Sequence, residues 1–159
     1  MRKIKTAEAA LIAVRADGLA LRDVPEEMRT EEVCLEAVRQ YGPALAFVPK
    51  ERKTPEVCLE AVKQDGRALK FVPERLKTPA VCIEAVQRRG LSLLDVPVPM
   101  RSEEMCLVAV RQHAGAMQYV PVRHRDAVRS SLATEAAAGA EPEAGEEEAA
   151  GQGRRFMNG

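Results

Sequence analysis

The chain has 159 residues, and its 24 basic side chains balance 24 acidic ones, while tryptophan is absent and other aromatic residues are scarce. No stretch is long and apolar enough to span a membrane. The basic start at residues 1–5 leads into an apolar run that Glu8 and Arg15 interrupt, which argues against a secretory signal. We therefore expect a cytoplasmic protein with no membrane association; delivery to a host cell by a non-classical route is the alternative that the sequence leaves open.

A period of 24 residues organises the chain, with equivalent starts at Thr6, Thr30, Thr54, Thr78 and Ser102. The clearest copy is residues 54–77, which read TPEVCLEAVKQDGRALKFVPERLK. A fixed period is the mark of a tandem-repeat protein, in which each unit buries its apolar face only by stacking on its neighbours.

Each repeat begins with the signals of a helix start. Thr54 can cap free backbone N–H groups, Pro55 suits the first helical position, and Glu56 favours the positive end of the helix dipole. The predicted helix is apolar on most of its circumference, which indicates neighbours on several sides. Gly66 stands where the helix ends, and we interpret it as a position that needs a left-handed backbone.

A second, shorter helix follows this glycine. Leu69 and Val72 lie about one helical turn apart, and Pro73 ends the element because the residue before a proline is disfavoured in helical geometry. A polar turn then leads to the next cap. The unit is a long helix, a short helix and a turn, so the sequence predicts an all-α array of helix-turn-helix repeats stacked as a short α-solenoid.

The repeats vary along the chain. Residues 6–29 diverge, as a terminal repeat does when it covers the end of an array. Residues 30–53 and 54–77 resemble one another most, and residues 78–101 and 102–125 keep the pattern. A partial capping helix is expected from Asp126, so the predicted folded body is residues 1–132.

Residues 133–159 contrast with this body in composition and charge. The body carries 22 basic and 18 acidic side chains, whereas residues 133–159 carry 2 basic and 6 acidic ones. They consist mainly of alanine, glutamate and glycine, with too few apolar side chains to form a core. We therefore predict a disordered acidic tail.

The motif V-C-L-E-A-V-x-Q-x-G followed by A-L-x-F-V-P, clearest in residues 57–73, resembles a bacterial and protist repeat family, domain of unknown function 4116. The resemblance covers residues 30–125 well and residues 6–29 loosely. It implies short helical repeats in tandem in a bacterial or protist protein. It implies no activity, and no catalytic residue can be transferred from it.

One cysteine recurs in each of four repeats: Cys34, Cys58, Cys82 and Cys106. A metal or redox ladder is one interpretation, and a small apolar side chain at a tight contact between helices is the other. Neighbouring helices stand about 8–10 Å apart, too far for an undistorted disulfide, and no C-x₂-C pair is present. We therefore assign these cysteines to the core in reduced form and expect no metal and no cofactor.

One base stands just before each cap position: Arg29, Lys53, Lys77, Arg101 and Arg125. We call this set the basic column. It is a candidate surface for phosphates or an acidic partner; alternatively it is a solvated face that neighbouring glutamates neutralise. A second, incomplete column is formed by Arg15, Arg39, Lys63 and Arg111. Phe47, Phe71 and Tyr119 are interpreted as core, which leaves no aromatic platform for nucleic-acid bases, so nucleic acid is not the expected ligand.

No pairing of a nucleophile with a base, no paired carboxylates and no glycine-rich phosphate loop stands out in the sequence. We therefore expect no catalytic residues and no enzymatic activity. Solenoids present extended surfaces, which favours a non-catalytic protein-interaction module with a protein partner. A phosphate-bearing or nucleic-acid ligand along the basic column is the alternative, and a metal or enzyme role comes third.

Overall fold

The computed structural model describes residues 4–140, and within this range the chain forms α-helices and 3₁₀-helices without β-strands. The α-helices are α1 (Ala7–Ala16), α2 (Glu31–Gln40), α3 (Pro55–Gln64), α4 (Pro79–Arg88), α5 (Glu103–Gln112) and α6 (Val122–Gly139). The 3₁₀-helices are η1 (Gly18–Asp23), η2 (Glu26–Met28), η3 (Gly42–Phe47), η4 (Lys50–Arg52), η5 (Gly66–Phe71), η6 (Glu74–Leu76), η7 (Gly90–Asp95), η8 (Val98–Met100) and η9 (Ala114–Tyr119). None of these described helices has both the length and the apolar character that crossing a membrane requires.

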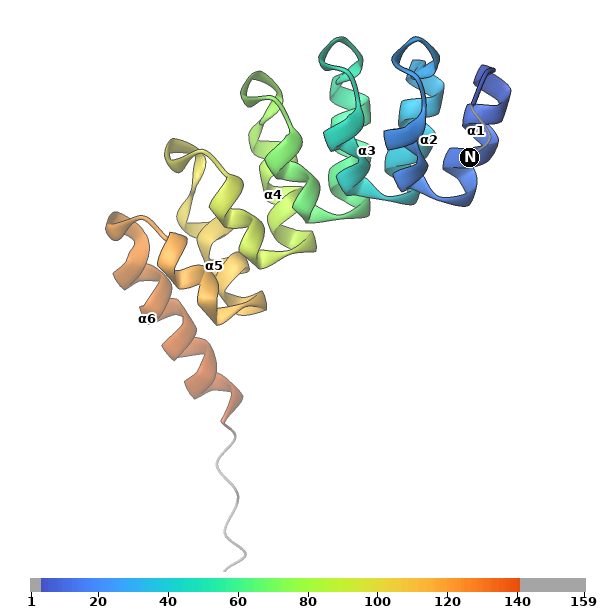
Figure 1. Cartoon of the computed structure of the whole chain (residues 1–159). Helices are drawn as coiled ribbons and strands as arrows, with labels where there is room; N and C mark the ends of the chain where they lie inside the picture. The colour runs from blue at the N-terminus through green and yellow to red at the C-terminus, as the bar shows by residue number, and fades with distance from the viewer. Residues whose placement is uncertain (1–3, 141–159) are drawn as a thin grey trace, which may run out of the picture.

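A typical repeat folds into an α-helix of ten residues, a 3₁₀-helix of six and a 3₁₀ turn of three. The α-helices follow one another in a single curved row from α1 to α6 (Figure 1). The six-residue 3₁₀-helices η1, η3, η5, η7 and η9, here called the short helices, form a second row, because consecutive members pack against one another. This arrangement confirms the all-α class and the stacked tandem repeats, which have the form of a short solenoid.

The α-helices begin where the sequence predicts. Thr54 is extended, with φ −77° and ψ 162°, and its hydroxyl oxygen accepts a hydrogen bond from the Val57 backbone N–H at 3.3 Å. The same cap is made by Thr6, Thr30, Thr78 and Ser102. A hydroxyl cap stabilises a helix by about 1 kcal/mol, so this recurring residue fixes where the helix of each repeat begins.

Each of these α-helices then ends through one extended residue. Asp65 has φ −151° and ψ 119°, and its N–H donates to the Ala61 carbonyl oxygen at 3.0 Å. The short helix η5 starts directly afterwards at Gly66 and ends at Phe71, before Pro73. The predicted order of long helix, short helix and turn is therefore confirmed, with the short helix in the 3₁₀ form.

The prediction that Gly66 needs a left-handed backbone is wrong, because no glycine within residues 4–140 has a positive φ. Glycine is required there for a different reason. A Cβ atom on Gly66 would lie well within 3.0 Å of the Ala85 carbonyl oxygen in the next repeat, closer than real Cβ atoms approach. The same contact recurs at Gly18, Gly42 and Gly90. This glycine column therefore marks where the backbones of consecutive repeats touch.

The core consists of small aliphatic side chains and extends through all the repeats. In α3, Val57, Cys58, Ala61 and Val62 are fully buried, and so is Leu69 in η5. Because α3 packs against α2, α4, η3 and η5, its apolar circumference is covered on several sides, as the sequence predicts. Full burial of a valine or leucine side chain stabilises a fold by about 1.5–3 kcal/mol, so stacking is the main source of stability.

The last helix differs from the prediction at both ends. The sequence predicts a partial helix from Asp126 and a disordered tail from residue 133, whereas α6 begins at Val122 and continues to Gly139. No threonine or serine cap interrupts the chain after Pro121, so the turn and the α-helix of the other repeats merge. Alanine and glutamate, which favour helix, carry it through residues 133–139. The rest of the predicted tail, residues 141–159, lies outside the described residues, as do residues 1–3.

Candidate functional site

The cysteine column lies in the core. All four thiols are fully buried and free: Cys34, Cys58, Cys82 and Cys106. Burial raises the pKa of each, that of Cys34 to about 11. A thiol that stays protonated is a poor nucleophile and a poor metal ligand, so the column serves as small apolar packing. Among residues 4–140, no three histidine, cysteine, aspartate or glutamate side chains gather as a metal site requires.

The basic column is brought together, but its charged groups point into the repeat junctions. Arg29 donates from Nη1 to the Phe47 carbonyl oxygen of the next repeat at 2.7 Å. The same bond, to the residue 18 positions ahead, is made by Lys53 to Phe71 at 3.1 Å, Lys77 to Asp95 at 3.0 Å and Arg101 to Tyr119 at 2.7 Å. Each acceptor is the last residue of a short helix, where a carbonyl has no partner within its own helix. These bonds engage the bases between repeats, so a ligand-facing role of the column stays an untested hypothesis.

Arg101 shows that one such base can donate hydrogen bonds to several backbone carbonyl oxygens. Besides its bond to the next repeat, its Nε donates to the Val96 carbonyl oxygen at 2.9 Å and its Nη2 to the Leu94 carbonyl oxygen at 3.1 Å. Arg125, the last member, donates only within its own repeat among the described residues, to the Val120 carbonyl oxygen at 3.0 Å, because the continuous helix α6 stands where the next repeat would be. The column therefore ties repeats together.

The two lysines of the column donate across the junction alike but differ in burial. Lys77 is only 8% exposed, and its Nζ also lies 2.7 Å from a carboxylate oxygen of Glu74. Lys53 is only partly buried, and burial lowers its pKa. Both ammonium groups donate to a carbonyl oxygen of the next repeat, which occupies part of what a phosphate would need.

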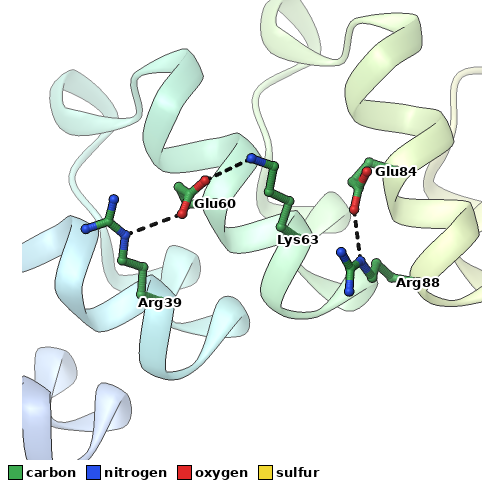
Figure 2. Close-up of polar contacts among 5 residues, drawn as sticks. All are labelled: Arg39, Glu60, Lys63, Glu84 and Arg88. Atoms are coloured by element: carbon green, nitrogen blue, oxygen red, sulfur yellow. Dashed lines mark hydrogen bonds and ion pairs between the residues drawn. The ribbon is translucent and has the colours of Figure 1, made fainter.

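Two members of the second basic column, Arg39 and Lys63, form ion pairs on the outside of the α-helix row (Figure 2). Glu60 lies between two bases, with an oxygen 3.3 Å from Nε of Arg39 in the preceding repeat and the other 3.1 Å from Nζ of Lys63. The hydrogen bond from Lys63, together with that from Arg39, lowers the pKa of Glu60 against a smaller opposing effect of burial. Glu84 and Arg88 pair at 2.9 Å within α4. These charges neutralise one another.

The repeats differ most on the outer side of the short helices. Each short helix has three outward positions. The first holds Leu19, Pro43, Arg67, Leu91 and Gly115, and the second holds Arg22, Ala46, Lys70, Leu94 and Gln118. The third, at the end of the helix, holds Asp23, Phe47, Phe71, Asp95 and Tyr119. The residues just before the short helices vary too: Asp17, Tyr41, Asp65, Arg89 and His113. We call these four sets the short-helix face. Inward positions stay constant, as in Leu21, Leu45, Leu69 and Leu93. The short-helix face is therefore a variable surface that stacking does not use; the turns at residues 26–28, 50–52, 74–76 and 98–100 vary as well.

Three adjoining hollows run along the short-helix face. The first, of about 220 Å³, is mainly apolar and is lined among others by Leu19, Tyr41, Pro43, Phe47 and Phe71. The second, of about 240 Å³, shares Arg67 and Lys70 with the first and extends to Leu94 and Tyr119. The third, of about 350 Å³, shares Arg89 and Leu91 with the second and reaches His113. Because neighbouring hollows share side chains, we describe them together as the groove.

The aromatic residues of the groove have a second, partly exposed side in addition to the core contact that the sequence predicts. Phe47, Phe71 and Tyr119 pack against the core on one side, but they are only half-buried and line the hollows on the other. Their apolar type and regular spacing indicate core. The one available signal of a surface role is that Asp23 and Asp95 occupy the same position in other repeats.

The groove changes in character along its length. Its first hollow is aromatic and aliphatic, whereas its second is lined by three bases, Arg67, Lys70 and Arg89. Arg67 pairs with Asp65 at 2.6 Å. Burial opposes ionisation of Asp65, but hydrogen bonds from Arg67 outweigh it and lower the pKa of that carboxyl group. Among the described residues neither Arg89 nor Lys70 forms an ion pair, so both are available to a ligand.

Two adjacent stretches of the chain, residues 8–53 and 54–101, match the family model described as Domain of unknown function (DUF4116). Each stretch spans a pair of repeats. The match includes the divergent first repeat and stops before residues 102–125, although these fold like the others. No curated protein matches the chain, and no solved structure matches it. Since the two stretches together cover more than half of the 159 residues, the chain belongs to the DUF4116 family.

Proposed function

We propose that the chain is a non-catalytic protein-interaction module that binds its partner along the short-helix face. The observation that carries this proposal is that recurring and variable side chains lie in different places within each repeat. Side chains that recur in every repeat are used for stacking, and side chains that differ line the groove. Protein interfaces favour aromatic and arginine side chains, and the groove offers Tyr41, Phe71, Arg67 and Arg89.

The polar groups on which catalysis most often depends are engaged in structural contacts within residues 4–140. The thiols are buried and protonated. His113 accepts a hydrogen bond on Nδ1 from the Gly115 backbone N–H at 3.1 Å, and His124 Nε2 lies 2.9 Å from Nε of Arg123. These contacts favour a binding role over a catalytic one.

A phosphate-bearing or nucleic-acid ligand along the basic column is less well supported. Four of its five bases donate to backbone carbonyl oxygens of the next repeat. A phosphate would have to displace these bonds and separate two repeats. A ligand on the short-helix face would not have to displace these bonds between repeats.

The experiment compares two double variants of the full chain in cross-linked capture from lysate of the source cells, read by mass spectrometry. The face variant changes Leu19 and Leu94, which are 38% and 54% exposed, to serine. The matched control changes Ile12 and Val98, which are 64% and 52% exposed and lie outside the groove, to serine. Thermal melting establishes that both variants fold.

We expect a discrete partner to be captured by the unchanged chain and by the control variant but lost from the face variant. Retention by both variants would place the binding surface elsewhere. Loss from both would indicate a general effect of removing exposed apolar side chains, and the proposal would then be wrong.

A further inference from the structure

We propose that the groove binds an extended, acidic segment of a partner protein, with an apolar side chain in the first hollow and carboxylates against Arg67 and Arg89. The inference rests on the proposed function and specifies the chemistry of the partner. It follows from the order of side chains along the groove, from its dimensions and from its charge.

The dimensions suit single side chains arranged in a line. The first two hollows measure about 220 and 240 Å³, below the roughly 300–1,000 Å³ of pockets that enclose a small-molecule ligand. They adjoin along successive short helices, because Arg67 and Lys70 line both. An extended peptide places side chains along such a row without needing one deep cavity.

The first hollow supplies an apolar anchor site. Leu19, Tyr41, Phe47 and Phe71 come from three consecutive repeats and line it together. Burial of one leucine or phenylalanine side chain of a ligand there removes apolar surface from water, which contributes about 25 cal/mol per Å². Aromatic anchors of this kind dominate the energetics of many protein interfaces.

The second hollow supplies the charge that selects an acidic ligand. Arg67, Lys70 and Arg89 line it together with the carboxylate of Asp95, and Asp65 pairs with Arg67, so the bases exceed the carboxylates by one. The Lys70 ammonium lies 4.7 Å from the centroid of the Phe71 ring, so one base sits at the border with the apolar hollow. Arginine can bind a carboxylate through two parallel hydrogen bonds, and Arg89 has no ion-pair partner among residues 4–140.

The same groove disfavours nucleic acid. Asp65 and Asp95 place two carboxylates beside the three bases, and a continuous row of phosphates would meet both. The net charge of the whole chain is zero, so no general positive field assists a polyanion. A peptide can place acidic residues only where the groove is basic.

The test measures fluorescence polarisation of the full chain with labelled probes at low salt. The probe is a short peptide with one leucine followed by glutamates; the comparison probes are its glutamine counterpart and an oligothymidylate of similar length. The groove variant changes Arg67 and Arg89 to glutamine. The matched control changes Arg15 and Arg75 to glutamine, since these bases are exposed and lie outside the groove.

We expect saturable binding of the glutamate peptide that weakens at least about tenfold in the groove variant and in the glutamine peptide, and changes less than about twofold in the control variant. Arg89→Gln alone should account for a large part of the loss. Arg89→Gln breaks no ion pair within residues 4–140, and melting curves check that the fold of each variant is intact.

Other outcomes overturn the inference. Equal weakening by both variants would indicate a non-specific charge effect, and stronger binding of oligothymidylate than of the peptide would indicate a nucleic-acid surface. Binding of the peptide only after the glutamates of residues 141–148 are changed to glutamine would make the chain's own acidic segment the occupant. If the groove variant still captures the lysate partner while the Leu19 and Leu94 variant does not, the interaction module stands and only the acidic ligand is wrong.

Discussion

The repeat junctions and the short-helix face are built from the same repeats, yet they vary to very different extents. At the junctions, a glycine touches the backbone of the next repeat at Gly18, Gly42, Gly66 and Gly90, and a base donates across the junction to the next short helix. On the face, equivalent positions hold residues as unlike as Pro43 and Arg67, or Phe71 and Asp95.

This contrast separates what the array needs to stack from what it can use to bind. Stacking succeeds only if every junction has the same geometry, because each repeat contacts only its neighbours. The face carries no such constraint. The last junction supports this view: Ala114 stands in the glycine position and is exposed, since no repeat of the same form follows it. The predictions below test the contrast, starting from the junction contact that we expect to matter most.

Gly66→Ala should destabilise the chain strongly, by about 3 kcal/mol in the free energy of unfolding. The new Cβ would meet the Ala85 carbonyl oxygen, a backbone atom that can move only if two repeats separate. Chemical denaturation of the variant and the unchanged chain measures the difference. Gly139→Ala is the control, because a Cβ there has open space within 4 Å, and it should have little effect.

Gly66→Asn distinguishes close contact from the left-handed backbone that the sequence suggests. Asparagine tolerates a positive φ better than most residues, so it should be mild if backbone conformation were limiting. Because asparagine has a Cβ, we expect it to destabilise the chain at least as much as alanine. A mild effect would restore the original interpretation.

Arg101→Met should cost about 2 kcal/mol, because it removes three charge-assisted hydrogen bonds to the carbonyls of Val96, Leu94 and Tyr119. Arg125→Met is the matched control, since Arg125 makes one such bond and none across a junction. Urea denaturation should show a clearly smaller loss for Arg125. Equal losses would mean that the contact to the next repeat contributes nothing.

The difference between these two arginines shows where sequence reasoning succeeds and where it stops. The period, the hydroxyl caps and the ten-residue helices follow from local signals, and the structure has them as predicted. The recurring base is equally visible in the sequence, but its partner is a backbone carbonyl 18 residues further on, which no side-chain pattern reveals. A recurring base whose partner cannot be read from the sequence is therefore interpreted as part of a ligand surface.

The role of the glycine and the exposed side of the aromatic residues escape the sequence for related reasons. A glycine after a helix suits a left-handed turn and also suits close contact, and only the position of Ala85 in space decides between them. Phe71 has the composition and spacing of a core residue, and its exposure depends on how the neighbouring short helices are placed. Both properties belong to the packing between repeats, which the sequence of one repeat does not contain.

The buried thiol of Cys34 predicts a loss of stability at alkaline pH, on the order of 2 kcal/mol. Burial raises its pKa to about 11 from an ordinary 9.0. A raised folded pKa gives stability that is complete below the unfolded pKa and is lost as pH rises through the folded value. Denaturation of the unchanged chain and Cys34→Ala between about pH 8 and pH 11 isolates this thiol; identical pH profiles would contradict the prediction.

Ser92→Ala should stabilise the chain by about 1 kcal/mol. Ser92 is 3% exposed, and its hydroxyl has no hydrogen-bond partner among the described residues, which carries a cost of about 1–3 kcal/mol. The equivalent residue is alanine in Ala20, Ala44, Ala68 and Ala116. The reverse change, Ala68→Ser, is the matched control and should destabilise by a similar amount. A destabilising Ser92→Ala would mean that the hydroxyl has a partner in solution.

Glu60→Gln should have the smallest effect, about 0.3–0.5 kcal/mol at neutral pH, although Glu60 bridges two repeats in Figure 2. Its side chain is 27% exposed and both of its partners are close to half exposed, and pairs in such surroundings contribute little. The pKa of Glu60 is lowered, so its contribution is present above the unfolded pKa and is lost as pH falls through the folded one. The difference in stability between the variant and the unchanged chain should therefore disappear in acid and shrink at high salt.

Glu84→Gln, which removes a pair within one helix, is the control. A loss above about 1 kcal/mol for Glu60 alone would mean that the ion pairs hold the repeats together as the glycine and arginine contacts do, and the contrast between junction and outer surface would have to be redrawn to include them.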